Sequence, residues 1–208
     1  MSDFFEFDLT DIMNDLQSNV KKDSKKDFID IVNLDSALNR ILFLEDIEAG
    51  IGLSFDTQIR FWNRYDEAHN IPVEDREPIK VIIDSCGGSL TDAFIIIDAI
   101  RKSKTPVWTI AAGCAYSGGF FVLIAGDRRS GYKHSSYLFH EGSASNGGTS
   151  SQFENFTAFY KKQLEQLKEI VLSYTSISKE QYDKIKKEDI WYTATEALEN
   201  GIIDEILE

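Results

Sequence analysis

The chain has 208 residues, of which 42% are hydrophobic and 12% aromatic, and this composition suits one domain with a substantial buried core. Its formal net charge of −13 repels phosphate groups, so we expect no nucleic-acid partner. Two cysteines, Cys86 and Cys114, are too few for a disulfide framework, and no basic segment precedes an apolar run near the start. We therefore expect a cytoplasmic protein with no membrane association.

Residues 1–29 differ in character from the rest of the chain. Apolar residues between Leu9 and Leu16 have helical spacing, and four lysines follow between positions 21 and 26. We predict a short amphipathic helix and a flexible linker, which together form an N-terminal extension to a domain at 30–208.

From residue 40, short β-branched runs alternate with longer stretches that have helical spacing. This alternation predicts an α/β domain with a largely parallel sheet and helices on its faces. In chain order we predict a strand at 40–44, a helix capped by Asp56, a strand at 81–83, a helix opened by Ser89 and Asp92, a strand at 107–111, a buried helix at 117–124 and a strand at 137–139.

The last third of the sequence is predicted to be mainly helical. Residues 141–150 are rich in Gly, Ser and Asn and precede a long helix at 151–174, for which Ser151 and Glu154 form a capping box. This helix has a wide apolar stripe, so we expect it to pack against its own domain or against another subunit. Two shorter helices are predicted to begin at Ser178 and Thr193.

Ser117 lies in the turn A-Y-S-G-G (115–119), between a predicted strand and an apolar helix. The positive end of the helix dipole lies near such a serine, and its small neighbours allow a substrate backbone to approach. A serine that merely caps the helix explains the same pattern, so this turn alone does not identify an active site.

A second turn, D-S-C-G-G-S at 84–89, also joins a strand to a helix. Its exposed backbone N–H groups can bind a phosphate or an oxyanion, although an ordinary tight turn would also require the glycines. The sequence fits neither the Walker phosphate loop nor the GxGxxG dinucleotide motif.

His140 directly follows the predicted strand at 137–139 and begins the Gly/Ser-rich loop, where catalytic groups are common. A buried structural histidine is an equally good interpretation of His140 alone. His69 and His134 lie in polar turns, and we expect both at the surface. No spacing of Cys and His residues suggests a metal site, and no cofactor is expected.

Together, these motifs resemble the Clp protease proteolytic subunit family. In that family an N/D-S-x-G-G turn supplies oxyanion donors and a G-x-A-x-S-x-G turn supplies the nucleophile. This chain has D-S-C-G-G at 84–88 and G-C-A-Y-S-G-G at 113–119. The segment T-A-T-E-A at 193–197, preceded by Asp189, and G-I-I-D at 201–204 match the family's C-terminal motifs.

The resemblance covers about residues 40–208 and implies a Clp protease/crotonase-like α/β fold, a repeated ββα superhelix with a protruding handle helix. The handle region would occupy about residues 141–175. The resemblance also implies a homo-oligomer of heptameric rings, single or stacked as a tetradecamer. Such rings admit unfolded polypeptides that an AAA+ unfoldase supplies.

For the active site, the resemblance implies a serine endopeptidase with Ser117 as nucleophile, His140 as general base and Asp189 orienting the histidine. The backbone N–H groups of Gly88 and Gly118 would form the oxyanion hole.

The sequence departs from the family at several of these positions. Gly118 replaces a usual methionine, and we expect its missing side chain to enlarge the neighbouring pocket. Cys86 replaces a proline, and Glu141-Gly142 replaces Gln-Pro, so that a carboxylate follows the histidine and would disfavour acidic substrates.

Three alternatives remain at this level. Acyl-CoA hydratases and isomerases share the fold but usually rely on carboxylates. A catalytically inactive ring subunit would keep the fold without the chemistry. Related proteases of the same fold mature viral capsids or use a Ser–Lys dyad.

Overall fold

The computed structural model describes residues 36–208. The chain divides into two units, Met1–Asn39 and Arg40–Glu208, and the features below belong to the second. The predicted helix near Leu9–Leu16 and the predicted extension at 1–29 lie outside the described residues. Within the described part, no helix is both long enough and apolar enough to span a membrane.

The second unit is built on a seven-stranded sheet with the order β1-β2-β3-β4-β7, in which β5 pairs with β3 and β6 pairs with β5. All of these pairs are parallel except β5–β6, which confirms the predicted largely parallel sheet. The strands are β1 (Ile41–Leu44), β2 (Ile79–Ser85), β3 (Val107–Tyr116), β4 (Arg128–Tyr132), β5 (Ser136–Phe139), β6 (Ile190–Thr193) and β7 (Glu205–Leu207).

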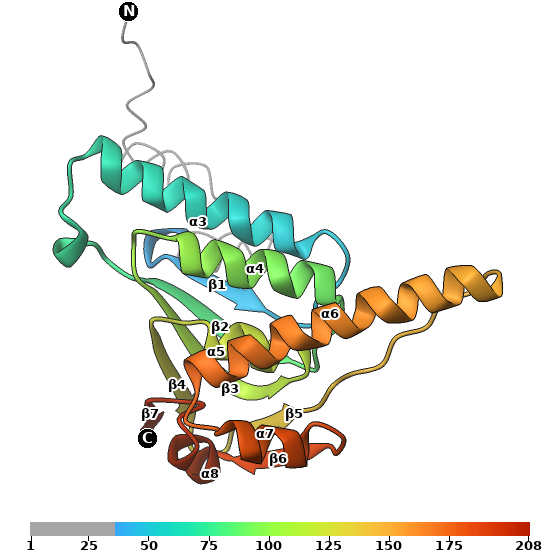
Figure 1. Cartoon of the computed structure of the whole chain (residues 1–208). Helices are drawn as coiled ribbons and strands as arrows, with labels where there is room; N and C mark the ends of the chain where they lie inside the picture. Colours follow the sequence, from blue (N-terminus) through green and yellow to red (C-terminus); the bar gives the residue numbers. More distant parts are fainter. Residues whose placement is uncertain (1–35) are drawn as a thin grey trace, which may run out of the picture. The chain divides into compact units, whose positions relative to one another are not determined.

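The helices include a long one, α6, that extends well beyond the sheet, while α3 and α4 lie side by side across it (Figure 1). This arrangement agrees with the predicted protruding handle. The helical elements are α3 (Ile51–Ala68), the 3₁₀ turn η1 (Val73–Asp75), α4 (Leu90–Lys102), α5 (Gly118–Ile124), α6 (Ser150–Tyr174), α7 (Lys179–Ile185) and α8 (Ala194–Glu199).

Two predicted helix starts are wrong. Asp56 lies inside α3, where it pairs with Arg60, and the helix instead begins after Gly50. Asp92 of α4 accepts hydrogen bonds from the N–H groups of Gly50 and Gly52 at 2.9 and 3.1 Å, so the cap comes from another helix. The capping box of α6 is formed by Thr149 and Gln152, which have the same spacing as the predicted pair two residues later.

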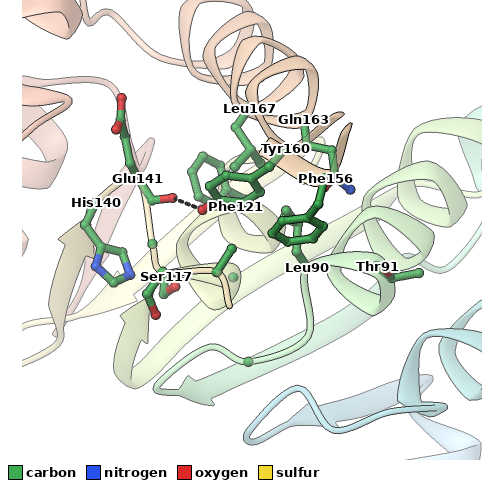
Figure 2. A pocket seen from close by; sticks show the side chains of 15 residues that line it. Leu90, Thr91, Ser117, Phe121, His140, Glu141, Phe156, Tyr160, Gln163 and Leu167 are labelled. Carbon is green, nitrogen blue, oxygen red and sulfur yellow. Dashed lines mark hydrogen bonds between the residues drawn. The ribbon is translucent and has the colours of Figure 1, made fainter. Parts of the chain in front are cut away.

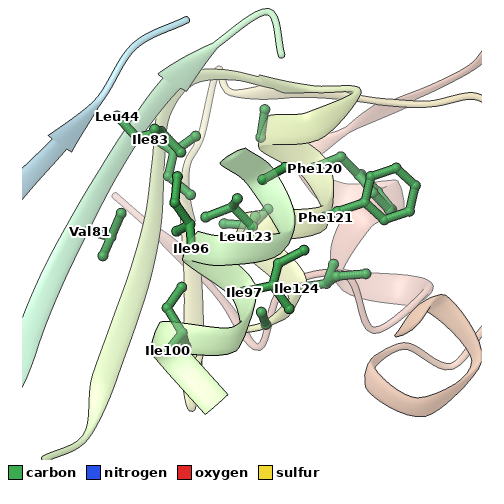
Figure 3. Packing of buried hydrophobic residues seen from close by; sticks show 14 of the residues in the cluster. Leu44, Val81, Ile83, Ile96, Ile97, Ile100, Phe120, Phe121, Leu123 and Ile124 are labelled. Carbon is green, nitrogen blue, oxygen red and sulfur yellow. The ribbon is translucent and has the colours of Figure 1, made fainter. Parts of the chain in front are cut away.

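The hydrophobic core lies between the sheet and helices α4 and α5 (Figure 3). Burial alternates along β2, so one of its faces packs on the helices while the other is partly exposed. Every residue of α5 is buried, as expected for a helix that is apolar all round. The residues labelled in Figure 3 are Leu44, Val81, Ile83, Ile96, Ile97, Ile100, Phe120, Phe121, Leu123 and Ile124.

A buried ion pair joins the start of β1 to α3. The guanidinium of Arg40 donates to both carboxylate oxygens of Asp66 at 2.6 and 2.8 Å, and the Thr105 hydroxyl donates to the same carboxylate at 2.7 Å. Burial alone opposes ionisation of Asp66, but the hydrogen bonds and the charge of Arg40 outweigh it and hold the pKa of this carboxyl below its usual value.

Candidate active site

Ser117 occupies the sharp turn between β3 and α5. Its φ of 53° lies in the left-handed region that non-glycine residues rarely adopt. Its N–H donates to the carbonyl of Leu138 in β5 at 3.0 Å, which ties the turn to the neighbouring strand. The side chain makes no capping hydrogen bond to α5, so the hydroxyl does not act as the helix cap that the sequence also allowed.

The two glycine-containing turns pack directly against each other. Gly87 has a φ of +98°, and a Cβ atom placed on it would lie 2.7 Å from the Cβ of Ser117 and 2.9 Å from the N of Gly118. Real Cβ atoms do not tolerate such distances, so the approach of these turns requires glycine at this position.

Gly88 and Gly118 both line the same pocket. Ile47 pairs with Gly88 in a parallel bridge. The N–H of Ile47 donates to the carbonyl of Gly87, and the carbonyl of Ile47 accepts from the N–H of Ser89. In such a bridge the N–H of the central residue points away from the partner strand. Gly118 is the first residue of α5, where the N–H has no partner within the helix. Both groups are therefore suitable donors for a bound anionic oxygen.

His140 and Asp189 come together because β5 pairs with β6. Phe139 lies opposite Ile190 in this antiparallel ladder, so the residues just beyond the pair, His140 and Asp189, lie next to each other. The Nδ1 atom of His140 is 3.5 Å from Oδ1 of Asp189, which is within ion-pair distance but longer than a good hydrogen bond. The His140 side chain is 28% exposed and that of Asp189 is 65% exposed.

The other ring nitrogen of His140 faces the nucleophile turn. Figure 2 shows the imidazole directed toward Ser117. Its Nε2 atom is buried and makes no hydrogen bond within the described residues. The structure thus brings the three side chains singled out in the sequence to one place, and His140 lies between the other two.

A pocket of about 390 Å³ opens beside Ser117 (Figure 2). Its walls combine the two turns, the segment after His140 and one side of α6, and they carry both apolar and polar side chains. The residues that line it are Gly88, Leu90, Thr91, Ser117, Gly118, Phe121, His140, Glu141, Gly142, Ser143, Ala144, Phe156, Tyr160, Gln163 and Leu167.

The contribution of α6 to this pocket was not predicted. The apolar stripe of this helix indicated a packing surface, but its spacing does not tell which residues pack inward and which line a cavity. Phe156 and Tyr160 stack with ring planes 7° apart and form one wall. The Tyr160 hydroxyl donates to the carbonyl of Glu141 at 3.0 Å.

The structure shows what surrounds two of the positions that depart from the family pattern. A Cβ at Gly118 would lie 2.9 Å from Cδ1 of Ile47, so the Ile47 side chain occupies the space next to this glycine. The Glu141 carboxylate points away from Ser117 in Figure 2, so discrimination against acidic substrates has no support from this geometry.

Other reactive groups are less suited to the chemistry. The pKa of the Cys114 thiol is raised to about 12, first by burial and then by Asp84 and Cys86, so this thiol stays protonated at neutral pH. His69 and His134 are exposed, as predicted. Both cysteines are free, and residues 36–208 contain no group of three or more side chains that would hold a metal ion.

Comparison with known proteins finds one family model and several relatives. The family model for the Clp protease matches residues 71–208. The chain is 34% identical over 134 residues to ATP-dependent Clp protease proteolytic subunit 2 of Treponema pallidum, covering 64% of this chain and 67% of that protein. It is 32% identical over 177 residues to subunit 3 of Parasynechococcus marenigrum, covering 82% and 83% of the two chains. A third relative, subunit 2 of Thermobifida fusca, is 36% identical over 142 residues, covering 66% of this chain and 69% of the relative.

Proposed function

The chain belongs to the Clp protease family, and on that premise we propose that it is a serine endopeptidase that cleaves unfolded polypeptides. One observation carries the proposal: the His140 imidazole is directed toward Ser117 (Figure 2), its Nε2 atom has no hydrogen-bond partner within the described residues, and its Nδ1 atom lies 3.5 Å from the Asp189 carboxylate.

In the proposed mechanism, His140 accepts the proton of the Ser117 hydroxyl as the oxygen attacks the scissile carbonyl. The same imidazole then donates this proton to the leaving amine, and water hydrolyses the acyl-enzyme by the reverse sequence of proton transfers. Asp189 orients the imidazole and stabilises its protonated form. The negative charge on the tetrahedral oxygen would be bound by the N–H groups of Gly88 and Gly118.

The segment after His140 offers a surface for the substrate backbone. Residues 143–149 are exposed and form neither helix nor strand. Their backbone groups can pair with an extended peptide, which would bring binding energy without much dependence on substrate sequence. The pocket beside Ser117 would then receive one substrate side chain.

For the quaternary structure, we propose a homo-oligomer of heptameric rings, in which α6 contributes to the contact between two rings. The exposed aromatic residues Phe153 and Phe159 on α6 support a contact with another subunit. The rings would be fed by an AAA+ unfoldase in the cytoplasm, since the named relatives are described as ATP-dependent. A Ser–Lys dyad has no support here, because no lysine lines the pocket.

The test is cleavage of a fluorogenic peptide and of casein by wild type, Ser117→Ala and Ser54→Ala. Ser54 is a suitable control because it is exposed on α3 and lies outside the pocket. Labelling with a fluorophosphonate and the native mass of each protein are measured in parallel. We expect Ser117→Ala to lose both cleavage and labelling, and Ser54→Ala to keep both. An assembled wild type that neither cleaves nor labels would instead identify an inactive ring subunit.

A further inference from the structure

The segment that follows the proposed base has few contacts to hold it. Phe139 is the last residue of β5 that pairs with β6, and His140 lies just beyond it. Gly142 has a φ of +77°, and the chain from there to residue 149 has no regular secondary structure. Pairing between the strands therefore fixes His140 from its N-terminal side alone.

One side chain holds the segment from the other direction. The hydroxyl of Tyr160 on α6 donates to the carbonyl of Glu141 at 3.0 Å (Figure 2). Beyond the β5–β6 ladder, this is the one hydrogen bond that residues 36–208 make to the backbone of residues 140–148. The base is thus held between a strand pair at Phe139 and a side-chain contact at Glu141.

We propose that Tyr160 is a positioning residue, which fixes the backbone next to His140 and so keeps the imidazole directed toward Ser117. This inference rests on the proposed peptidase function. Tyr160 is itself well placed for the role, because its ring stacks on Phe156 with a centroid separation of 6.2 Å and forms part of the pocket wall. Burial, followed by the charge of Glu141, raises the pKa of the Tyr160 hydroxyl, which keeps the donated proton in place at working pH.

The same contact links α6 to the active site. In its C-terminal half, α6 is anchored by the buried side chains of Leu167 and Val171, whereas Phe153 and Phe159 nearer its start are 55% and 57% exposed. Tyr160 lies between these two parts of the helix. A shift of the exposed half of α6 would therefore reach the backbone of Glu141 through Tyr160, and from there the base.

The decisive variant is Tyr160→Phe, which keeps the ring and removes the donor. Its matched control is Tyr174→Phe on the same helix, because the Tyr174 ring packs against the Arg101 guanidinium 4.8 Å away and lies outside the pocket. We expect Tyr160→Phe to lower kcat for a fluorogenic peptide by roughly three- to tenfold, the typical effect of one hydrogen bond, with KM changed by less than about twofold. Tyr174→Phe should match wild type in both constants.

A second measurement does not depend on activity. Hydrogen–deuterium exchange of peptides that span residues 139–149 should be faster in Tyr160→Phe than in wild type or Tyr174→Phe, at equal native mass and thermal midpoint. Unchanged exchange, or a kcat equal to that of Tyr174→Phe, would overturn the role of Tyr160. An inactive wild type with the expected exchange difference would overturn the peptidase proposal and leave the contact established.

Discussion

The close approach of the two turns makes Gly87 a sharp test of the site geometry. In Gly87→Ala the new methyl group would lie 2.7 Å from the Cβ of Ser117 and 2.9 Å from the N of Gly118, so one of the turns must move by several tenths of an ångström. Both the proposed nucleophile and a proposed oxyanion donor belong to the turn that is pushed. Misplacement of reacting groups on the scale of 1 Å costs about 10²-fold in rate, and we expect a loss of kcat of that order.

Gly50 provides a matched control for backbone strain. Its φ of +96° is close to the +98° of Gly87, but a Cβ at Gly50 would meet nothing within 4 Å. An alanine at either position pays the cost of a left-handed conformation, about 1–2 kcal/mol of unfolding free energy. Only Gly87→Ala also brings a new methyl group against the turn that carries Ser117. The two variants should therefore lose similar unfolding free energy from the strained backbone but differ in kcat.

The assay is steady-state cleavage of a fluorogenic peptide by both variants, together with urea unfolding to measure the strain. Gly50→Ala should retain a kcat within about twofold of wild type despite its lower stability, since it leaves the site untouched. Equal activity of the two variants would show that the turn at Gly87 does not position Ser117, and would refute the geometric argument.

Two further substitutions address the ion pairs. Asp66→Asn leaves the buried guanidinium of Arg40 unpaired and should lower the unfolding free energy by about 3–5 kcal/mol at pH 7. The pKa of Asp66 is lowered in the folded state. The stability that ionised Asp66 contributes is therefore present above the unfolded pKa of about 3.9 and is lost as the pH falls through the folded pKa. In urea unfolding, the difference in unfolding free energy between Asp66→Asn and wild type should therefore shrink toward pH 3. Asp189→Asn should lower kcat for a fluorogenic peptide by about 10²-fold. This loss is smaller than the ~10⁴-fold loss of kcat for a buried triad aspartate, because Asp189 is 65% exposed and lies 3.5 Å from His140. A change in kcat within about twofold would show that Asp189 has no part in the mechanism.

The sequence predicted best those features that depend on local residue types. The turns at 84–89 and 115–119 were identified because glycine and serine between a strand and a helix restrict the backbone. The largely parallel sheet followed from the alternation of strands and helices.

Features that depend on contacts between residues far apart in the chain could not be predicted from the sequence. The cap of α3 is the carboxylate of Asp92, about 40 residues away, whereas the sequence around this helix suggests Asp56 as a local cap. The space beside Gly118 is filled by Ile47, which no spacing rule connects to it. Periodicity marked the apolar face of α6 but could not show that Tyr160 reaches the backbone after His140. In each case the missing information was which elements meet in space.

The Nε2 atom of His140, which has no hydrogen-bond partner within the described residues, favours a contact between His140 and Ser117. A buried polar atom without a hydrogen bond costs about 1–3 kcal/mol, and Nε2 is the one such side-chain atom among residues 36–208. The Ser117 hydroxyl makes no capping hydrogen bond, and both residues line the same pocket. A hydrogen bond between this hydroxyl and Nε2 would recover the cost. The arrangement therefore favours the contact through which His140 would accept the serine proton, provided that the strand pair at Phe139 and the Tyr160 contact keep the imidazole in place.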